Sequence, residues 1–295
     1  MRLRASGANF SPLNLPPPEI ADDHTVEVRT VAKKLVVQCP GKVIADRLRF
    51  IDARPEIVGI AAETKALNLK VKDDLMRANV VDGYETEGCS QTLLADLHQY
   101  HYRETRAEFP SSPLVHAASI EMNGGMVLFV GDKGAGKSTL ICALGLSGAK
   151  VLGDEHVILD GGKAITRPRT LRLKTGSLQW LPQAFCDTVS AHHFVTDWHG
   201  FRIFSVPPSV FGSPWVLSPM PVRAVVMLKP NHGGASSMRR ITADEATPRL
   251  FDNAVLPTHS KVRGLGDLRM LLTRTTLVEL RAGCLERATR LVYGL

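Results

Sequence analysis

The residues of this chain whose types and spacing best fit a defined chemistry lie between positions 131 and 138. They read Gly-Asp-Lys-Gly-Ala-Gly-Lys-Ser and fit the pattern G-x-x-x-x-G-K-[ST] at every fixed position. Glycines let the backbone approach a ligand closely, so that N–H groups converge on phosphate oxygens at the start of a helix. We therefore predict a nucleotide-phosphate site made of Gly131, Gly134, Ala135, Gly136, Lys137, Ser138 and Thr139.

Two side chains at the end of this loop have separate roles in the prediction. Lys137 is expected to neutralise the β- and γ-phosphates, and the Ser138 hydroxyl is expected to bind Mg²⁺. We expect Lys137 to be an exposed point charge that takes no part in packing. Asp132 and Lys133 have no assigned role and are expected at the surface. The alternative interpretation is a glycine-rich turn with an exposed lysine.

A pair of acidic residues, Asp154 and Glu155, follows the apolar run Val151-Leu152 and Gly153. This place is the expected C-terminal end of a strand, where open α/β sheets bind ligands. Asp154 lies only sixteen residues after Ser138. Because one short helix and one strand span that interval, both residues can return to the same edge of the sheet. The pattern predicts a carboxylate near Mg²⁺ and the γ-phosphate, although a solvated strand end or a helix cap remains the alternative.

The elements that must position these residues can be predicted from apolar periodicity and turn residues. Strands are expected over 114–120 and 126–130, joined by a tight turn at 123–125. A helix is expected over 139–146, and a strand over 150–152. Asp160-Gly161-Gly162-Lys163 is a strong hairpin signal between strands at 156–159 and 164–167. The loop is thus expected between a strand and a helix.

From about residue 114 to residue 174 the sequence resembles the C-terminal domain of HPr kinase/phosphorylase and the HPr-kinase-related proteins, whose P-loop core is similar to that of phosphoenolpyruvate carboxykinase. The residues that carry the resemblance are His116-Ala117-Ala118, Gly125, the loop itself, Gly153-Asp154-Glu155, and Pro168-Arg169 with Leu173-Lys174. The resemblance implies an α/β P-loop domain of this type that uses ATP and Mg²⁺.

The resemblance also implies roles for individual residues. Asp154 would take the proton from the acceptor hydroxyl, and Glu155 beside it would help Ser138 to position Mg²⁺. His116 and Arg169 are candidates for further phosphate contacts, with a structural strand histidine as the alternative for the first. Arg167, Arg169, Arg172 and Lys174 either supply charge to phosphates or form a basic surface strand.

One family signature is displaced in this chain. Family members that phosphorylate the phosphocarrier protein have Arg-Gly-Leu-Gly shortly after the acidic pair, whereas here Arg263-Gly264-Leu265-Gly266 comes more than a hundred residues later. We therefore expect no efficient phosphorolysis, and we do not expect HPr itself as the acceptor.

The chain before the loop predicts a smaller α+β module. Residues 1–22 form a polar, proline-rich tail, residues 23–112 the module, and residues 113–295 the P-loop domain, with the boundary at Phe109-Pro110-Ser111-Ser112-Pro113. Strands are expected over 24–37, 57–60 and 66–71 and a helix over 91–102, and residues 42–51 are ambiguous. His98 and His101 share a helix face, where we expect them at the surface because no third metal ligand accompanies them.

Composition excludes several classes of protein. Of the 295 residues 44% are hydrophobic and 22% charged, which is ordinary for a globular chain and not for a disordered or collagen-like one. No apolar run approaches the roughly 18 to 20 residues of a membrane helix. The leader does not fit a signal peptide, so we expect a cytoplasmic protein with no membrane partner. Five scattered cysteines without a C-x-x-C pair indicate neither a disulfide framework nor a zinc finger.

The formal charge of +7 favours an anionic partner, and most of the excess follows Arg223. A nucleotide accounts for it without a nucleic-acid partner, and a solvated basic surface is the alternative. His192, His193, Asp197 and His199 are metal-ligand types, but their spacing does not match a helical zinc site, and we expect a partly buried loop. A homo-oligomer remains open.

The sequence as a whole favours an ATP-dependent kinase that transfers the γ-phosphate to a hydroxyl of a protein, peptide or small molecule. The alternative is an ATP-dependent switch or ATPase module that has no acceptor substrate. The short interval between the loop and Asp154 favours the kinase.

Overall fold

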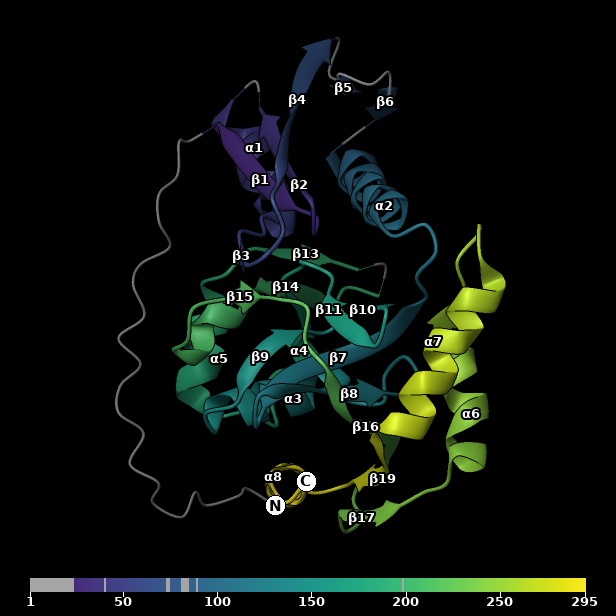
Figure 1. The fold of residues 1–295 in the computed structure, drawn as a ribbon. Coiled ribbons are helices and arrows are strands. Elements are labelled where there is room, and N and C mark those ends of the chain that lie inside the picture. Colours follow the sequence, from purple (N-terminus) through teal and green to yellow (C-terminus); the bar gives the residue numbers. More distant parts are fainter. Residues whose placement is uncertain (1–23, 40, 73–74, 81–84, 89, 198) are drawn as a thin grey trace.

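A nine-stranded mixed sheet after residue 113 carries the candidate site in the computed structural model of this chain (Figure 1). The structure describes residues 24–39, 41–72, 75–80, 85–88, 90–197 and 199–295. The predicted tail at 1–22 lies outside these residues. In the order in which they pair, the strands are β11 (Lys163–Thr166), β10 (His156–Asp160), β7 (Leu114–Met122), β8 (Gly125–Val130), β16 (Val222–Pro230), β19 (Thr276–Ala282) and β17 (Ser237–Arg240), with β9 (Lys150–Gly153) and β18 (Ala254–Val255) also paired to β7.

The middle of this sheet is buried on both faces. β8, β16 and β19 run parallel to one another. Successive residues of β8 alternate between two separate hydrophobic clusters, with Val127 and Phe129 in one and Met126, Leu128 and Val130 in the other. A nearly continuous apolar run is what a strand needs when both of its faces are covered. This explains why β8 reads as Gly-Met-Val-Leu-Phe-Val.

Helices cover both faces of the sheet. The cluster of Val127 and Phe129 also contains residues of α3 (Lys137–Leu146), α5 (Gln183–Ser190) and α8 (Leu285–Tyr293). The cluster on the other face contains residues of α6 (Ala243–Asp252) and α7 (Lys261–Arg274), which lie side by side in Figure 1. A smaller sheet of β12 (Leu171–Lys174), β14 (Arg202–Val206) and β13 (Phe194–Thr196), the short helix α4 (Thr175–Leu178) and the 3-10 turn η2 (Pro208–Phe211) complete this part.

The N-terminal part forms a second sheet of five strands with its own apolar cluster. It contains the helix α2 (Ser90–Glu108), whose Leu97 and Tyr100 belong to that cluster. Figure 1 shows α2 beside the edge of the larger sheet. The remaining elements are β1 (Thr25–Arg29), β2 (Lys33–Gln38), α1 (Lys42–Leu48), η1 (Arg49–Ile51), β3 (Glu56–Ile57), β4 (Glu63–Lys72), β5 (Leu75–Val80) and β6 (Glu85–Gly88).

The two parts are joined by backbone pairing as well as by side chains. β3 pairs in parallel with β15 (Val216–Leu217), which lies far along the chain. Val31, Ala53 and Ile57 pack into the cluster that α6 and α7 cover. The N-terminal part is therefore joined to the larger sheet by both kinds of contact.

The predicted elements around the loop are confirmed, with ends that differ by a few residues. The turn between β7 and β8 has positive φ at Asn123 (52°) and Gly124 (71°), as a two-residue hairpin requires. β10 and β11 form the second predicted hairpin. The ambiguous stretch 42–51 is helical, and the short strand expected over 66–71 extends over the ten residues of β4. Among the described residues no helix is long and apolar enough to cross a membrane.

Candidate functional site

The predicted phosphate loop lies between β8 and α3, at the carboxyl end of a central strand. Gly134 has φ 88° and Gly136 has φ 91°, a left-handed conformation that residues with a Cβ rarely adopt. Gly136 is the N-cap of α3, and no side chain caps this helix end. The buried Ala135 and the partly buried Thr139 flank it. The loop thus directs the positive end of the α3 dipole at the site, as anion binding requires.

Lys137 is buried, which corrects the prediction of an exposed point charge. Its side chain is only 7% exposed, and Nζ donates to the backbone oxygens of Gly131 (2.5 Å) and Asp132 (3.1 Å). Burial lowers the pKa of Lys137 from its ordinary value, while Asp154 and Asp132 act against this shift. The correction follows from α3 beginning at Lys137, two residues before the predicted start.

Ser138 and Asp154 lie in direct contact, as their spacing in the sequence predicts. Ser138 Oγ donates a hydrogen bond of 2.9 Å to Asp154 Oδ2. β9 returns from α3 to pair with β7, and this brings its carboxyl end beside the loop. A hydroxyl and a carboxylate at the end of the phosphate loop are oxygen ligands of the kind that Mg²⁺ prefers.

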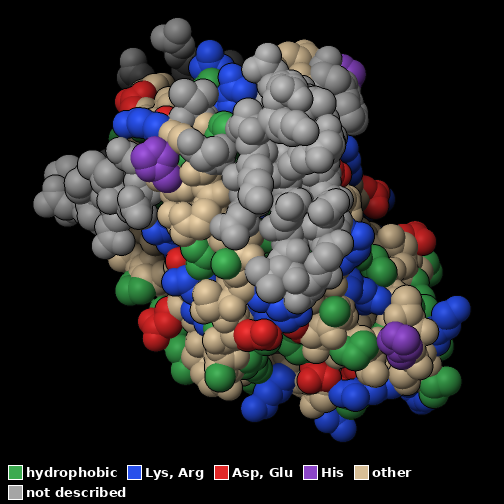
Figure 2. All heavy atoms as spheres, turned by 90° about the horizontal axis from the view of Figure 1, so that it is seen from above, with side chains coloured by type: hydrophobic (Ala, Val, Ile, Leu, Met, Phe, Trp, Pro, Cys, Tyr) green, Lys and Arg blue, Asp and Glu red, His purple; other side chains and the backbone are tan. Residues whose placement is uncertain are grey.

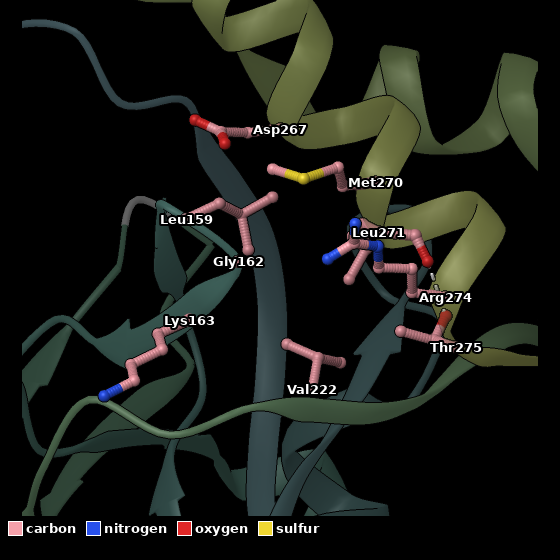
Figure 3. A pocket seen from close by; sticks show the side chains of 9 residues that line it. All are labelled: Leu159, Gly162, Lys163, Val222, Asp267, Met270, Leu271, Arg274 and Thr275. Atoms are coloured by element: carbon pink, nitrogen blue, oxygen red, sulfur yellow. Dashed lines mark hydrogen bonds between the residues drawn. The ribbon is translucent and has the colours of Figure 1, made fainter.

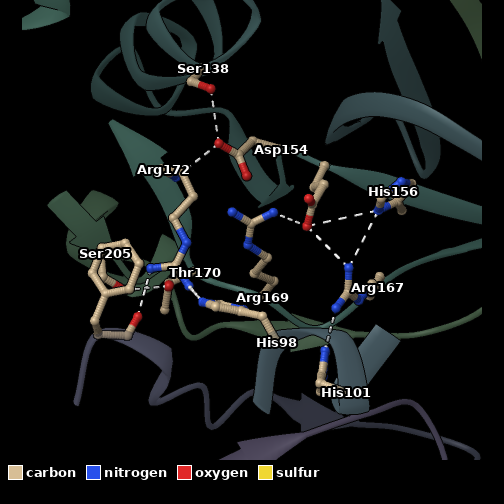
Figure 4. Close-up of polar contacts among 12 residues, drawn as sticks. His98, His101, Ser138, Asp154, His156, Arg167, Arg169, Thr170, Arg172 and Ser205 are labelled. Carbon is tan, nitrogen blue, oxygen red and sulfur yellow. Dashed lines mark hydrogen bonds and ion pairs between the residues drawn. The ribbon is translucent and has the colours of Figure 1, made fainter. Parts of the chain in front are cut away.

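The two carboxylate oxygens of Asp154 differ in their surroundings. Oδ2 also accepts from the backbone N–H of Arg172 at 2.9 Å. Oδ1 is buried and has no hydrogen-bond partner within the protein. A buried carboxylate oxygen is costly to leave unpaired. This orphaned atom, next to Ser138, therefore fits a group that receives a metal ion or a proton (Figure 4).

Glu155 contacts arginines instead of Ser138. Its Oε2 pairs with Arg169 Nη1 and lies 3.1 Å from Arg167 Nη1. The predicted role of Glu155 as a magnesium ligand is not tested by these contacts, which give the carboxylate a second function. It neutralises part of the charge of two arginines and fixes their side chains.

Arg167 connects the acidic pair to α2. Its Nη2 donates to His101 Nδ1 at 2.6 Å, and its guanidinium lies 5.3 Å from the Tyr102 ring centre. Since arginine only donates, His101 Nδ1 must be the acceptor, and Nε2 then donates to the backbone oxygen of Arg29 at 2.8 Å. His101 is 3% exposed, so the predicted surface position is wrong. It is a neutral link whose two nitrogens are both satisfied.

Arg172 makes the second connection to the N-terminal part. Nη1 donates to the backbone oxygen of Phe50 at 2.6 Å, and the guanidinium lies 3.8 Å from the centre of the Phe50 ring. Nη2 lies 3.4 Å from His98 Nε2. The alternative of a basic surface strand is therefore wrong for Arg172 and also for Arg167, which is 4% exposed.

Two further histidines face this cluster from neighbouring strands. His116 on β7 pairs with His156 on β10, and their ring centres are 5.7 Å apart. Burial, followed by the charge of Lys137, lowers the pKa of His116 to about 4. Burial, followed by Arg167, lowers the pKa of His156 to about 3. Burial also lowers the pKa values of His98 and His101, so all four rings are neutral near pH 7.

A cavity of about 280 Å³ opens between α2 and Glu155 of the acidic pair. The sequence interpretation missed the contribution of α2, because the predicted helix lies far from the loop in the chain. The one available signal was the pair His98 and His101 on one helix face. The cavity is lined by His98, Gln99, Tyr102, Glu155, His156, Arg167 and Arg169.

Other candidate features do not join this site. Arg263 lies on α7, where Nη2 pairs with Asp160 Oδ1 at 2.6 Å. Asp197 Oδ1 accepts from the backbone N–H groups of His199 and Phe201 and so closes a turn. In the described part of the chain, no group of three or more His, Cys, Asp or Glu residues could hold a metal ion. This result does not bear on Mg²⁺ held by Ser138 and a nucleotide.

A second cavity, of about 40 Å³, lies between α7 and the β10–β11 turn (Figure 3). Burial raises the pKa of Asp267, which lines it. The space is enough for water and too small for a nucleotide or a metabolite. On the face that Figure 2 shows, Lys and Arg side chains are interspersed with Asp and Glu among the described residues, without the continuous basic field typical of nucleic-acid binding.

No protein-family model matches the chain, and no curated protein matches it. Among solved structures, the chain resembles the Hpr(Ser) kinase/phosphatase from Coxiella burnetii, with 15% sequence identity and a TM-score of 0.31. The match covers 62% of this chain and 87% of that protein. A resemblance at this TM-score is too distant to assign an activity, and the roles of the residues must be argued from their own geometry.

Proposed function

We propose that this chain is an ATP-dependent phosphotransferase that transfers a γ-phosphate to an acceptor hydroxyl, as the sequence resemblance to HPr kinases implies. The observation that carries the proposal is the hydrogen bond between Ser138 and Asp154, with Asp154 Oδ1 buried and unpartnered beside it. Phosphoryl transfer requires mainly positioning and charge stabilisation, together with one group that accepts a proton. The chain has side chains for each of these tasks.

The loop and Lys137 would hold the triphosphate. The left-handed conformations of Gly134 and Gly136 would let backbone N–H groups converge on the phosphates, and Lys137 Nζ would exchange its carbonyl partners for phosphate oxygens. Ser138 Oγ would hold Mg²⁺, which neutralises charge on the β- and γ-phosphates when bound. Asp154 Oδ2, which accepts from Ser138 and from the Arg172 backbone, fixes the orientation of this hydroxyl.

Asp154 Oδ1 would take the proton of the acceptor hydroxyl. The acceptor oxygen forms a bond to the γ-phosphorus while the bond to the bridging oxygen of ADP breaks. Because Arg172 N and Ser138 hold Oδ2, Oδ1 keeps a fixed direction without competing partners. A base positioned in this way contributes typically about 10² to 10⁴ to the rate.

The division into an N-terminal module (23–112) and a P-loop domain (113–295) is part of this proposal. It is supported by the two sheets, because the five-stranded sheet consists of β1, β2, β4, β5 and β6, and all strands of the nine-stranded sheet come from β7 onward. The two modules would share the acceptor site, since α2 lines the cavity next to Glu155.

A nucleotide-dependent switch is the second candidate, and one observation favours it. Asp154 contacts Ser138 on one side and the Arg172 backbone on the other, and Arg172 bonds the carbonyl of Phe50 in the N-terminal part. A displacement of Ser138 on nucleotide binding would be transmitted through Asp154 and Arg172 to Phe50 in the N-terminal part. In this case ATP binds but no acceptor gains phosphate.

A transfer assay separates the two candidates. The protein and Mg²⁺ are incubated with ATP labelled at the γ-phosphate and with fractions of a cell extract, and the labelled species is identified. We expect label on a hydroxyl-bearing acceptor, and labelling at least about 100-fold slower with the variant Asp154→Asn. Bound ATP with label released only as inorganic phosphate would contradict the transferase and support the switch or ATPase.

A further inference from the structure

The cavity beside the acidic pair is built around buried positive charge. Arg167 has a side chain only 3% exposed and Arg169 one only 19% exposed, and both line the cavity. The Nε atoms of Arg167, Arg169 and Arg172 are all buried without a hydrogen-bond partner within the protein. Buried arginine N–H groups are normally paired with carboxylate or phosphate oxygens. The arginines therefore have unused donor capacity in a place where water is partly excluded.

The carboxylates at this place do not balance the cations. Guanidinium groups stay protonated in proteins, so three carboxylates, Asp154, Glu155 and Asp132, face four cations, Arg167, Arg169, Arg172 and Lys137. Of these carboxylates, Asp132 is exposed and acts on the pKa of Lys137. Lys137 bonds the carbonyls of the phosphate loop, the Arg172 guanidinium bonds the Phe50 carbonyl, and Arg167 and Arg169 line the cavity.

The histidines do not compensate this excess. His98 and His156 line the cavity, and the low pKa values of both rings leave them neutral. Arg172 Nη2 approaches His98 Nε2, so this nitrogen accepts and Nδ1 carries the proton. With Gln99 and Tyr102, the α2 wall therefore offers uncharged hydrogen-bonding groups, which suit hydroxyls. The other lining residues, Arg167, Arg169 and Glu155, are charged.

We propose that this cavity binds an oxyanion, a phosphate or a carboxylate, carried by a small hydroxyl compound, with Arg169 as its main ligand and Arg167 beside it. The inference rests on the proposed transferase function and names the class of its acceptor. A space of about 280 Å³ is close to the lower end of the range for small-molecule sites, about 300 to 1,000 Å³. Glu155 lines the cavity and directly follows Asp154 in the chain, so we expect the hydroxyl of a compound whose anion is held there to reach toward Asp154.

The geometry also gives Glu155 a defined effect on this binding. Its Oε2 is shared between Arg167 and Arg169 and competes with an incoming oxyanion for the same donors. Removal of the carboxylate charge should therefore strengthen anion binding, whereas removal of Arg169 should weaken it. A residue that served only the fold would not produce effects of opposite sign.

The test is a calorimetric titration of the full chain with inorganic phosphate, acetate, glycerol phosphate and glycerol, in the presence of Mg²⁺ and a saturating non-hydrolysable ATP analogue that fills the loop. We expect phosphate or acetate to bind and glycerol alone not to bind. Tighter binding of glycerol phosphate than of phosphate is expected from the uncharged α2 wall. Phosphate represents a phosphorylated acceptor and acetate represents a carboxylate acceptor. The anion that binds more tightly therefore distinguishes these two classes.

Arg169→Gln should lower the affinity for the bound anion about 10- to 100-fold, the usual effect of a charged hydrogen bond. Glu155→Gln should raise it several-fold. The control Arg290→Gln, at a side chain 71% exposed on α8, should leave it unchanged. Unchanged affinity in both Arg169→Gln and Glu155→Gln would overturn the proposal, as would the absence of anion binding. If Arg169→Gln does not fold, Glu155→Gln alone decides.

Failure of this inference can be distinguished from failure of the proposed function. If the ATP analogue binds and no oxyanion does, only the acceptor class is wrong. If the analogue does not bind, the proposed transferase function is wrong. Phosphate is then titrated into Lys137→Ala, in which the loop lacks its lysine. Binding there that Arg169→Gln removes would still establish the oxyanion site.

Discussion

The phosphate loop and the arginine cluster form the two halves of the proposed site, but they are constructed differently. The loop is a single run of residues between β8 and α3, and its conformation is set by glycines within the run. The arginine cluster combines residues from distant parts of the chain. His98 and Tyr102 lie on α2, Glu155 lies between β9 and β10, and Arg169 lies in the segment before β12. The first is therefore defined by local sequence, and the second only by tertiary folding.

The two halves also differ in what holds them. Lys137 in the loop bonds only backbone oxygens, which a ligand can replace. Arg167 and Arg172 each bond a group of the N-terminal part, through His101 and the Phe50 carbonyl. Changes in the loop should thus affect ligand binding, and changes in the cluster should also affect stability.

The largest effect is expected for Asp154→Asn, at the junction of the two halves. The amide can still accept from Ser138 and from Arg172 N, but it cannot take a proton. We expect nucleotide binding to persist while the transfer rate falls about 10² to 10⁴. Calorimetry with Mg·ATP and a single-turnover transfer assay measure the two quantities. Transfer at the parent rate would show that Asp154 is not the base and would make Glu155 the candidate.

The sequence predicts the loop half of the site and not the cluster half. The strand, loop and helix order follows from apolar runs and glycines, and the interval from Ser138 to Asp154 places these two together, as the structure has them. The burial of Lys137 depends on where α3 begins, which periodicity defines only within a few residues. The burial of His101 depends on α2 packing on the larger sheet, and no local pattern encodes that contact.

A smaller effect, on stability alone, is expected for His101→Ala. The change leaves Arg167 Nη2 and the Arg29 carbonyl without their partner in a buried place. We expect the free energy of unfolding to fall by about 1 to 3 kcal/mol. Urea unfolding measures it, with the exposed His232→Ala as the control, expected to change it by less than about 0.5 kcal/mol. Equal effects of the two changes would place His101 outside the network.

The next effect concerns pH. His156 has a pKa lowered to about 3 in the folded chain, against an ordinary value of 6.5. Between these values the unfolded chain binds a proton that the folded chain does not, so stability is full above pH 6.5 and falls as the pH decreases toward 3. One such ring contributes about 1.4 kcal/mol per pH unit. His156→Gln should reduce the slope of unfolding free energy against pH by about this amount. An unchanged slope would mean that this ring is not held neutral.

The proposed function depends most directly on the binding of nucleotide phosphates by the loop. Titration of Mg·ATP into the parent chain, Lys137→Ala and Lys133→Ala tests this, because Lys133 is an exposed lysine of the same loop and Lys137 is buried among its carbonyls. We predict that the parent chain and Lys133→Ala bind equally and that Lys137→Ala binds about 10- to 100-fold more weakly while remaining folded by circular dichroism. Equal affinity in all three, or no binding by the parent chain, would contradict the account.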